Sequence, residues 1–214
     1  MRLVFDFGGV VFRWKPHELL QRMLPQRAME ETAARALAAV FFQGHGDGDW
    51  AQFDRGTLGE DELVPRLAAR TGLDATSVRR IVDAVPAELQ PLADTVRWIE
   101  RLSAAGHTLH FLSNMPRPMA DHLVRSHPFL GRFASGVFSS HVRLLKPEPE
   151  IFAHSARQFD MSPDGLILLD DTQVNVDAAI AAGWQALHFR DAPSCEAALR
   201  ERGLFPRQPE STQP

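Results

Sequence analysis

Three carboxylates in this chain follow apolar segments, at positions where a catalytic or metal-binding site is expected. Asp6 interrupts the apolar run that begins at Leu3 (LVFDFGGVV), and Asp170 and Asp171 follow the run LILL. An unpaired carboxylate is costly to bury, so these acids belong where the chain opens to a ligand. Oxygen ligands with no histidine or cysteine nearby favour Mg²⁺ over zinc. A plainer alternative is that Asp6 caps a turn or a helix.

Further polar residues could complete a site for a phosphoryl group. Ser113 and Asn114 follow the apolar segment from Leu109 to Leu112, and Lys146 precedes a proline in a predicted loop. A hydroxyl, backbone amides and a lysine beside Mg²⁺ form a cradle for a transferring phosphoryl group. A carboxylate that faces this group can attack it and form an aspartyl phosphate. These residue types therefore predict Mg²⁺-dependent phosphoryl transfer.

A parallel sheet would bring these residues together. The first predicted strand begins the apolar run of residues 3–11 and is expected to stop at Asp6. Further apolar segments that read as strands cover residues 109–112, 137–138, 166–169 and 186–189. Strands that alternate with helices imply right-handed crossovers and a mainly parallel sheet, in which sites form at the carboxyl ends of the strands. The predicted fold class is α/β, a Rossmann-like parallel sheet core with an inserted all-helical cap subdomain.

The inserted cap is predicted from a long segment that has no convincing strand. From about Pro16 to Val85 the composition is helical, and Gln26 to Phe42 reads as a single helix rich in Ala, Glu and Arg. Asp74 is a good N-cap for a last helix, which Pro86 would end. The predicted division is a core of residues 1–13 and 87–203, a helical cap of residues 14–86, and a polar, proline-rich tail of residues 204–214 that is expected to be disordered.

Composition argues against several classes of function. The 214 residues suit one large domain or one domain with a smaller insert, with ordinary contents of 44% hydrophobic and 23% charged residues. The net charge of −4 gives no basic footprint, so nucleic acid is not an expected partner. No apolar run suggests a membrane span or a signal peptide, and the single Cys195 fits a reducing compartment. A cytoplasmic location is expected, and the oligomeric state is not indicated.

Four segments in this order resemble the motifs of the haloacid dehalogenase (HAD) superfamily: DFGGV, LSN, KPEPEIF and LLDDTQVNV. The resemblance extends to about Gly203, and the predicted helical insert resembles the cap of the first cap class in this superfamily. It implies a hydrolase that acts on a small phosphorylated metabolite through an aspartyl phosphate, with Mg²⁺ as cofactor.

The resemblance also implies a role for each matching residue. Asp6 would be the nucleophile. Ser113 would hydrogen-bond the transferring phosphoryl oxygens, with help from the backbone of Asn114. Lys146 would neutralise charge on Asp6 and on the phosphoryl group.

The metal site implied by the resemblance uses the same loops. Asp6 and the backbone carbonyl of Gly8 would bind Mg²⁺ together with Asp171, and Asp170 would bind directly or through water. Asn175 stands where a further acid often occurs; an amide can orient a neighbour there without adding charge.

Gly8 departs from the family pattern, because most phosphatases of the superfamily have a second Asp there. That Asp protonates the leaving oxygen and then activates water, and loss of a positioned acid–base group costs about 10²- to 10⁴-fold in rate. Another group could substitute, and His17, His45 and Asp49 are candidates from the cap side. Alternatively, the substrate has a good leaving group, such as an acyl phosphate, or the protein is not a fast enzyme.

The substrate prediction rests on a narrower resemblance. Bacterial α-D-glucose-1-phosphate phosphatases also have Asp-x-Gly in the first motif. Their caps carry an aromatic residue, a glycine and then acids, as in Phe53 to Gly56 followed by Glu60 to Glu62. This similarity favours a sugar-phosphate phosphatase.

Two alternatives from other classes stay open. A 2-haloacid dehalogenase would use Asp6 on carbon without a metal, but such a site gains nothing from the acid pair Asp170-Asp171. A non-enzymatic binding or regulatory protein would not need Asp6, Ser113 and Lys146 together.

Overall fold

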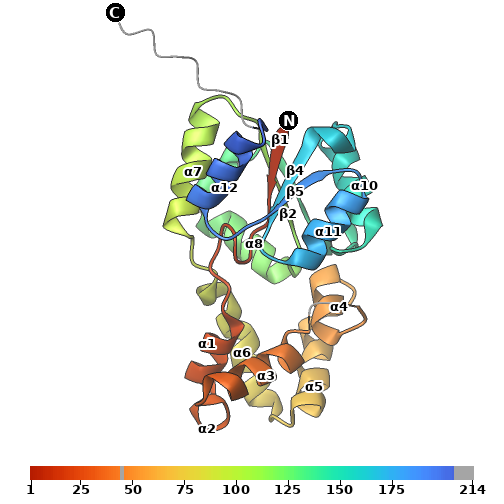
Figure 1. The fold of residues 1–214 in the computed structure, drawn as a ribbon. Coiled ribbons are helices and arrows are strands. Elements are labelled where there is room, and N and C mark those ends of the chain that lie inside the picture. The colour runs from red at the N-terminus through yellow and green to blue at the C-terminus, as the bar shows by residue number, and fades with distance from the viewer. Residues whose placement is uncertain (44–45, 205–214) are drawn as a thin grey trace, which may run out of the picture.

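A five-stranded parallel sheet forms the centre of the molecule, with helices on both of its faces (Figure 1). The computed structural model describes residues 1–43 and 46–204. The order across the sheet is β3-β2-β1-β4-β5, and every neighbouring pair is parallel. The strands are β1 (Arg2–Phe5), β2 (Leu109–Ser113), β3 (Ser135–Phe138), β4 (Leu166–Asp170) and β5 (Gln185–His188). The predicted α/β fold class is confirmed.

The register of the three central strands sets up one edge of the sheet as a site. Phe5, the last residue of β1, pairs with Phe111 of β2 and with Leu169 of β4. The chain then continues to Asp6, whose backbone N–H donates to the Leu169 carbonyl at 2.9 Å. Because the three strands are parallel, the polar residues that follow them emerge at the same edge.

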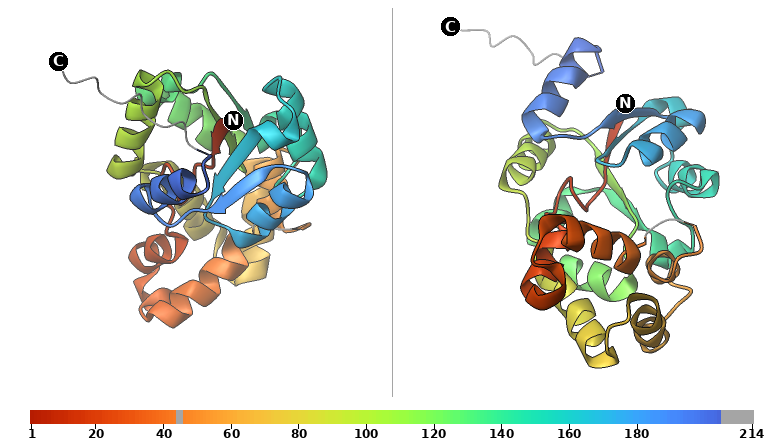
Figure 2. Two further views of the ribbon diagram at one scale, coloured as in Figure 1. Left: turned by 45° about the horizontal axis from the view of Figure 1, so that its top comes forward. Right: turned by 60° about the horizontal axis from the view of Figure 1, so that its bottom comes forward.

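Helices cover both faces of the sheet (Figure 2). They bury two apolar clusters, one on each face. On one face, Phe5 makes edge-to-face contacts with Trp98 and Phe133, at centroid distances of 5.4 and 5.8 Å. On the other face, Phe152 packs edge-on against Trp184. The flanking elements are α7 (Ala93–Ala104), α8 (Arg117–Ser126), η1 (Pro128–Arg132), α9 (Ser139–Val142), α10 (Pro149–Gln158), η2 (Pro163–Gly165), α11 (Gln173–Ala181) and α12 (Ala192–Glu201).

Six further helices lie between β1 and α7 in the sequence and face the carboxyl edge of the sheet (Figure 1). They are α1 (Pro16–Met23), α2 (Pro25–Ala28), α3 (Glu31–Phe41), α4 (Asp49–Arg55), α5 (Glu60–Thr71) and α6 (Ala75–Glu88), and we call this group the cap. Its apolar core is continuous with the cluster on one face of the sheet. The domain boundaries predicted above stay predictions. In residues 1–43 and 46–204, no helix has both the length and the apolar character needed to cross a membrane.

The first strand ends directly before Asp6, as predicted, although the apolar run continues beyond it. The apolar run reaches Val11, but β1 ends at Phe5. The residues beyond it form a turn in which the Phe7 carbonyl accepts hydrogen bonds from the N–H groups of Val11 and Phe12, at 2.9 and 2.7 Å. Their side chains are fully buried. The apolar run therefore reflects a buried loop as well as a strand.

Two helix predictions in the cap were wrong in their boundaries. The predicted helix over 26–42 is divided into α2 and α3, because Glu30 is extended and the chain turns so that α3 packs against α1. Helix α6 passes through Pro86 and ends at Glu88, since a proline in the last turn removes only one hydrogen bond. Asp74 is confirmed as the N-cap of α6, accepting from the Ser77 N–H at 2.8 Å. The expectation for the tail beyond residue 204 lies outside the described residues.

Candidate active site

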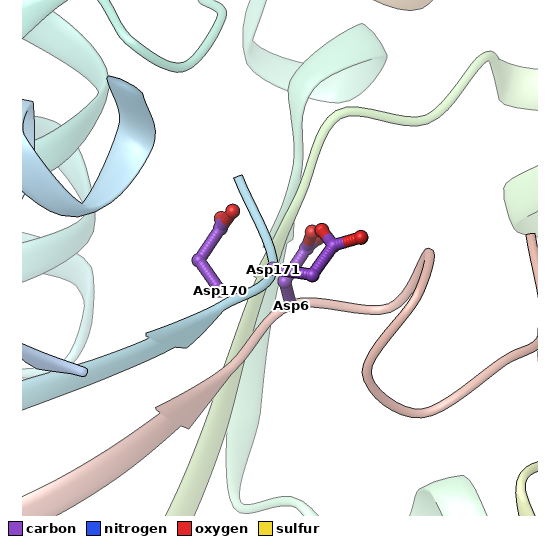
Figure 3. A group of neighbouring side chains, drawn as sticks. All are labelled: Asp6, Asp170 and Asp171. Carbon is purple, nitrogen blue, oxygen red and sulfur yellow. The ribbon is translucent and has the colours of Figure 1, made fainter. Parts of the chain in front are cut away.

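Three aspartates meet at the carboxyl edge of the sheet (Figure 3). Asp6, Asp170 and Asp171 each offer a carboxylate oxygen, and these oxygens lie within 4.8 Å of one another. Asp6 directly follows β1, and Asp170 is the last residue of β4. The all-oxygen donor set fits a hard divalent cation such as Mg²⁺, because such ions prefer carboxylate and carbonyl ligands.

Lys146 lies between two of these aspartates and is almost fully buried. Its Nζ is 3.0 Å from Oδ1 of Asp6 and donates to Oδ2 of Asp170 at 2.5 Å. Burial by itself would lower the pKa of Lys146, but the negative charges of Asp170 and Asp6 outweigh burial and raise that pKa. The ammonium group therefore keeps its charge and compensates two buried carboxylates.

The two neighbouring acids after β4 have different surroundings. Asp170 is fully buried and accepts from the Thr172 N–H at 2.9 Å and from Nδ2 of Asn175 at 3.0 Å, in addition to Lys146. Asp171 is exposed and accepts only from the Thr172 hydroxyl, at 3.3 Å, within the described residues. Asp170 is thus occupied by protein donors, whereas Asp171 has free oxygen lone pairs to offer a metal.

Gly9 is required by this arrangement for a reason that the sequence alone did not show. Its φ of +75° and its position beside Asp171 both exclude a side chain, since an added Cβ would lie 2.1 Å from Oδ2 of Asp171. Gly8 is different, because a Cβ there would meet only Trp14, at 3.7 Å. The first glycine leaves space in the site, and the second allows the β1 loop to pass close to Asp171.

The ionisation of Asp6 is sensitive to its surroundings. Burial raises the pKa of Asp6 to about 7, and the charges of Asp170 and Asp171 also raise it, while Lys146 opposes them. The Phe7 N–H donates to Oδ1 of Asp6 at 2.7 Å. A cation bound among the three acids would favour the ionised form that nucleophilic attack needs.

Ser113 is the last residue of β2, and Asn114, which follows it, lines the cleft described below. The Ser113 hydroxyl is buried and makes no hydrogen bond within the described part of the chain. Asn114 exchanges two hydrogen bonds with the backbone of Lys146, donating from Nδ2 to the carbonyl at 2.8 Å and accepting from the N–H at 2.9 Å. Asn114 therefore positions the lysine loop, a role in addition to the predicted binding of the phosphoryl group.

A cleft of about 420 Å³ lies between the sheet edge and the cap. Its walls include Asp6, Lys146 and Asp171 from the core, with Trp50 and Asp54 from the cap. A smaller recess of about 80 Å³ shares part of this wall and continues into an apolar region. The apolar lining of the recess comprises Trp14, Trp50, Val85, Leu89, Met115, Pro116 and Met119.

Among the described residues that line the cleft, Asp54 is the one with a titratable side chain that the sequence did not single out for chemistry. It lies on α4, and it is only 7% exposed. Burial, and next the charge of Asp6, raise the pKa of Asp54 well above its usual value. In the sequence, the segment Phe53 to Gly56 supports only a resemblance to sugar-phosphate phosphatases. The sequence does not show which residues Asp54 would contact.

Of the three residues named as substitutes for the missing acid, the two that the structure describes do not line the cleft. Asp49 forms ion pairs with Arg70 at 2.7 Å and Arg66 at 3.6 Å, so its charge is already matched. Neither Asp49 nor His17 lines the cleft, and His45 lies outside the described residues.

Comparison with known proteins identifies the family and a related phosphatase. The family model for haloacid dehalogenase-like hydrolases matches residues 2–183. The chain is 28% identical over 199 residues to the sesquiterpene phosphatase astK of Aspergillus oryzae, covering 92% of this chain and 94% of that protein.

Solved structures share the fold at low sequence identity. A HAD family enzyme of Bacteroides thetaiotaomicron in complex with magnesium and inorganic phosphate has a TM-score of 0.67 at 16% identity, covering 88% of this chain and 93% of that one. An L-2-haloacid dehalogenase of Xanthobacter autotrophicus with covalently bound chloropropionic acid has a TM-score of 0.66 at 20% identity, covering 97% and 84%. Proteins that catalyse different reactions thus share this fold, so the fold alone does not indicate which reaction this chain catalyses.

Proposed function

This chain belongs to the haloacid dehalogenase-like hydrolases, and on that premise we propose that it is a Mg²⁺-dependent phosphatase that forms an aspartyl phosphate on Asp6. The observation that carries the proposal is the grouping of Asp6, Asp170 and Asp171 around one buried lysine. A related phosphatase that matches nearly the whole chain supports it.

The proposed roles follow from the contacts of each residue. Asp6 attacks the phosphorus atom, and Lys146 compensates the charge of Asp6 and of the phosphoryl oxygens. The buried, unpartnered hydroxyl of Ser113 is available to a phosphoryl oxygen. Asp170 holds Lys146 in place from the opposite side.

The residues that would hold Mg²⁺ are Asp6, Asp171 and the backbone carbonyl of Gly8. When bound, the ion would offset negative charge on the carboxylates and on the phosphoryl group. The difference between Asp170 and Asp171 supports this assignment, because only Asp171 has oxygen lone pairs that protein donors do not occupy.

A metal-free dehalogenase is the main alternative, and the site argues against it. A reaction on carbon needs the nucleophile Asp6, but it gains nothing from an exposed second carboxylate at Asp171, which raises the pKa of Asp6. A carboxylate at Asp171 is instead expected if the site binds a cation.

The recess beside the cleft bears on the substrate. Its apolar lining suits a phosphate ester with an apolar body, such as an isoprenoid monophosphate, better than a hydroxyl-rich sugar. The name of the Aspergillus oryzae relative points in the same direction. We therefore propose an apolar phosphate monoester as substrate, with a sugar phosphate as the second candidate from the first-motif resemblance.

Phosphate release from a small panel tests this function. The panel contains farnesyl monophosphate, glucose 1-phosphate and acetyl phosphate, each with Mg²⁺ and with EDTA, and chloride release from 2-chloropropionate is measured in parallel. We expect Mg²⁺-dependent phosphate release with the highest kcat/KM for farnesyl monophosphate. Chloride release that persists in EDTA, without phosphate release, would establish the dehalogenase instead.

A further inference from the structure

We propose that Asp54 of the cap is the general acid and base of this site, in place of the aspartate that is missing at Gly8. The inference rests on the proposed phosphatase function and adds to it a catalytic residue from outside the four core motifs. It explains how a site with glycine at position 8 could still act on substrates with poor leaving groups.

The position of Asp54 is the first support. It lines the same cleft as Asp6, Gly8 and Lys146, and it also lines the apolar recess in which the body of a substrate would lie. A residue that lines both the cleft and the recess is placed at the junction between the phosphoryl group and the substrate body, where the leaving oxygen would lie. Within the described residues the Asp54 carboxyl group has no hydrogen bond or ion pair, although it is buried. Buried carboxyl groups normally have partners, so an unpaired one facing a cleft indicates a ligand.

The core holds Asp54 in place through its backbone. The Ser139 hydroxyl donates to the Asp54 carbonyl at 2.5 Å and accepts from the Met115 N–H at 2.8 Å. Met115 directly follows Ser113-Asn114, the motif expected to bind the phosphoryl group. One hydroxyl thus connects the cap acid to the loop that would position the reacting group.

The residues next to Asp54 attach the same turn of α4 to the lysine loop. The Arg55 guanidinium donates to Oε2 of Glu148 at 2.8 Å, and Glu148 accepts from the Leu145 N–H at 3.2 Å. Gly56 lies against α9, where an added Cβ would be 2.7 Å from the Ser140 carbonyl. The end of α4 is therefore fixed to the core on both sides of Asp54.

Gly8 leaves the space that this arrangement needs. The nearest atoms to a Cβ at position 8 belong to Trp14, and Gly8, Trp14 and Asp54 border the same recess. Because no side chain extends from position 8, the carboxyl group of Asp54 faces the cleft without a competing acid. Its raised pKa, caused by burial and then by Asp6, is consistent with a group that carries a proton before reaction.

The proposed step uses this proton once in each half-reaction. As Asp6 bonds to phosphorus and the bond from phosphorus to the ester oxygen breaks, the leaving oxygen takes the proton of Asp54 and departs as an alcohol. Water then attacks the phosphorus of the aspartyl phosphate and gives one proton to the Asp54 carboxylate. The bond from phosphorus to Asp6 breaks, which releases inorganic phosphate and restores both aspartates to their starting forms.

The dependence of rate on the leaving group tests this role. We compare wild type with Asp54→Asn on p-nitrophenyl phosphate, whose leaving group needs no proton, and on an alkyl phosphate that wild type hydrolyses. For Asp54→Asn we expect kcat/KM on the alkyl phosphate to fall about 10²- to 10⁴-fold, the range for a lost general acid. On p-nitrophenyl phosphate we expect a stoichiometric burst of nitrophenol followed by slow turnover, with phosphorylated Asp6 detected by intact-protein mass spectrometry.

Two further variants guard against an indirect effect. Gly8→Asp combined with Asp54→Asn should recover much of the lost activity on the alkyl phosphate, because it places an acid at the vacant position. Asp49→Asn is the matched control, since it removes another buried acid of the same helix that is already paired with arginine. Its kcat/KM ratio between the two substrates should equal that of wild type.

The outcomes separate this inference from the function on which it rests. Equal losses on both substrates without accumulated phosphoenzyme would overturn the acid–base role and indicate a structural one. Alkyl phosphate turnover by Asp54→Asn within about threefold of wild type would overturn it too, well short of the expected range. If wild type releases no phosphate from any substrate and forms no phosphoenzyme, the phosphatase proposal itself fails. Should Asp54→Asn not fold, Asp54→Ala, which also removes the carboxyl group, is measured instead, and an unchanged leaving-group dependence there would likewise count against the role.

Discussion

The two walls of the cleft differ in how their buried acids are compensated. On the sheet wall, Lys146 lies between Asp6 and Asp170, and Asp170 accepts additional hydrogen bonds from Asn175 and Thr172. On the cap wall, Asp54 is buried without a cation or a hydrogen-bond donor to its carboxyl group in the described residues.

This difference assigns the two walls to different chemical tasks. A carboxylate beside a cation is suited to attack phosphorus or to bind a metal, because its negative charge is stabilised. A buried carboxyl group without a counter-charge is suited to hold and return a proton. Mutations that alter one wall at a time should therefore have effects of different kinds.

The largest effect is expected for Asp6→Asn. Loss of the nucleophile should lower kcat by on the order of 10⁴-fold or more. The fold should persist, because Lys146 keeps its contact with Asp170. Steady-state phosphate release and circular dichroism measure the two properties. Gly8→Asp, which has room at Cβ, should change kcat far less. Near-normal turnover in Asp6→Asn would rule out the covalent mechanism.

Lys146→Met should show how much the sheet wall depends on its cation. Two buried carboxylates lose their shared partner, and removal of one member of a buried ion pair costs about 3–5 kcal/mol of stability. Urea denaturation in EDTA measures this loss without a contribution from bound metal. Asp54→Asn under the same conditions should show no such loss. Similar destabilisation in the two variants would mean that the two walls do not differ in how their buried acids are compensated.

The pH dependence of stability should distinguish Asp54 from an exposed acid of the cap. Because its folded-state pKa is raised above 3.8, the contribution of Asp54 to stability is complete at lower pH and is lost as pH rises through the folded-state value. Asp54→Asn should therefore lose less stability than wild type as pH rises from the unfolded-state pKa through the higher folded-state pKa of Asp54. Urea denaturation at each pH measures the difference.

Asp74→Asn provides a control with the opposite sign. Hydrogen bonds from Ser77, first from its side chain and then from its backbone, lower the pKa of Asp74. The stability it contributes is present above the unfolded-state pKa and is lost as pH falls through the folded-state value. Asp74→Asn should show the same loss of stability with rising pH as wild type. An identical pH profile for wild type and Asp54→Asn would contradict the prediction.

The smallest effect is expected where the two walls meet. Arg55 and Glu148 join the cap to the lysine loop, but their side chains are 22% and 34% exposed, so solvent weakens the ion pair to about 1 kcal/mol or less. Arg55→Ala should raise KM by about fivefold or less, the factor that this energy corresponds to, with kcat nearly unchanged. Arg97→Ala removes an exposed pair with Asp94, neither of which lines the cleft, and should change neither parameter. A large fall in kcat for Arg55→Ala would show that it positions Asp54 more directly than its exposure suggests.

Much of the sheet wall could be anticipated from local pattern. A strand that is buried on both faces needs apolar residues at nearly every position. The apolar segment 166–169 therefore predicted β4, with Asp170 at its end. The apolar run that contains the first strand extends beyond that strand, since Val10 and Val11 are buried in a turn and not in the sheet. Hydrophobic pattern reports burial, and burial in a loop looks the same as burial in a strand.

The cap wall depended on tertiary packing. Asp49 and Asp54 are the same residue type on the same short helix, and both are buried, so their local sequence does not say which one serves the site. Arginines 66 and 70 of α5 approach Asp49 and compensate it, while α9 and the β2 loop hold the backbone of Asp54 at the cleft. Local sequence determined which acids end strands and which residues cap helices, because those features depend on near neighbours. Only tertiary packing, of α5 on α4 within the cap and of the cap on the core, decided which cap acid lacks a counter-charge, because the groups that would supply it lie outside the helix.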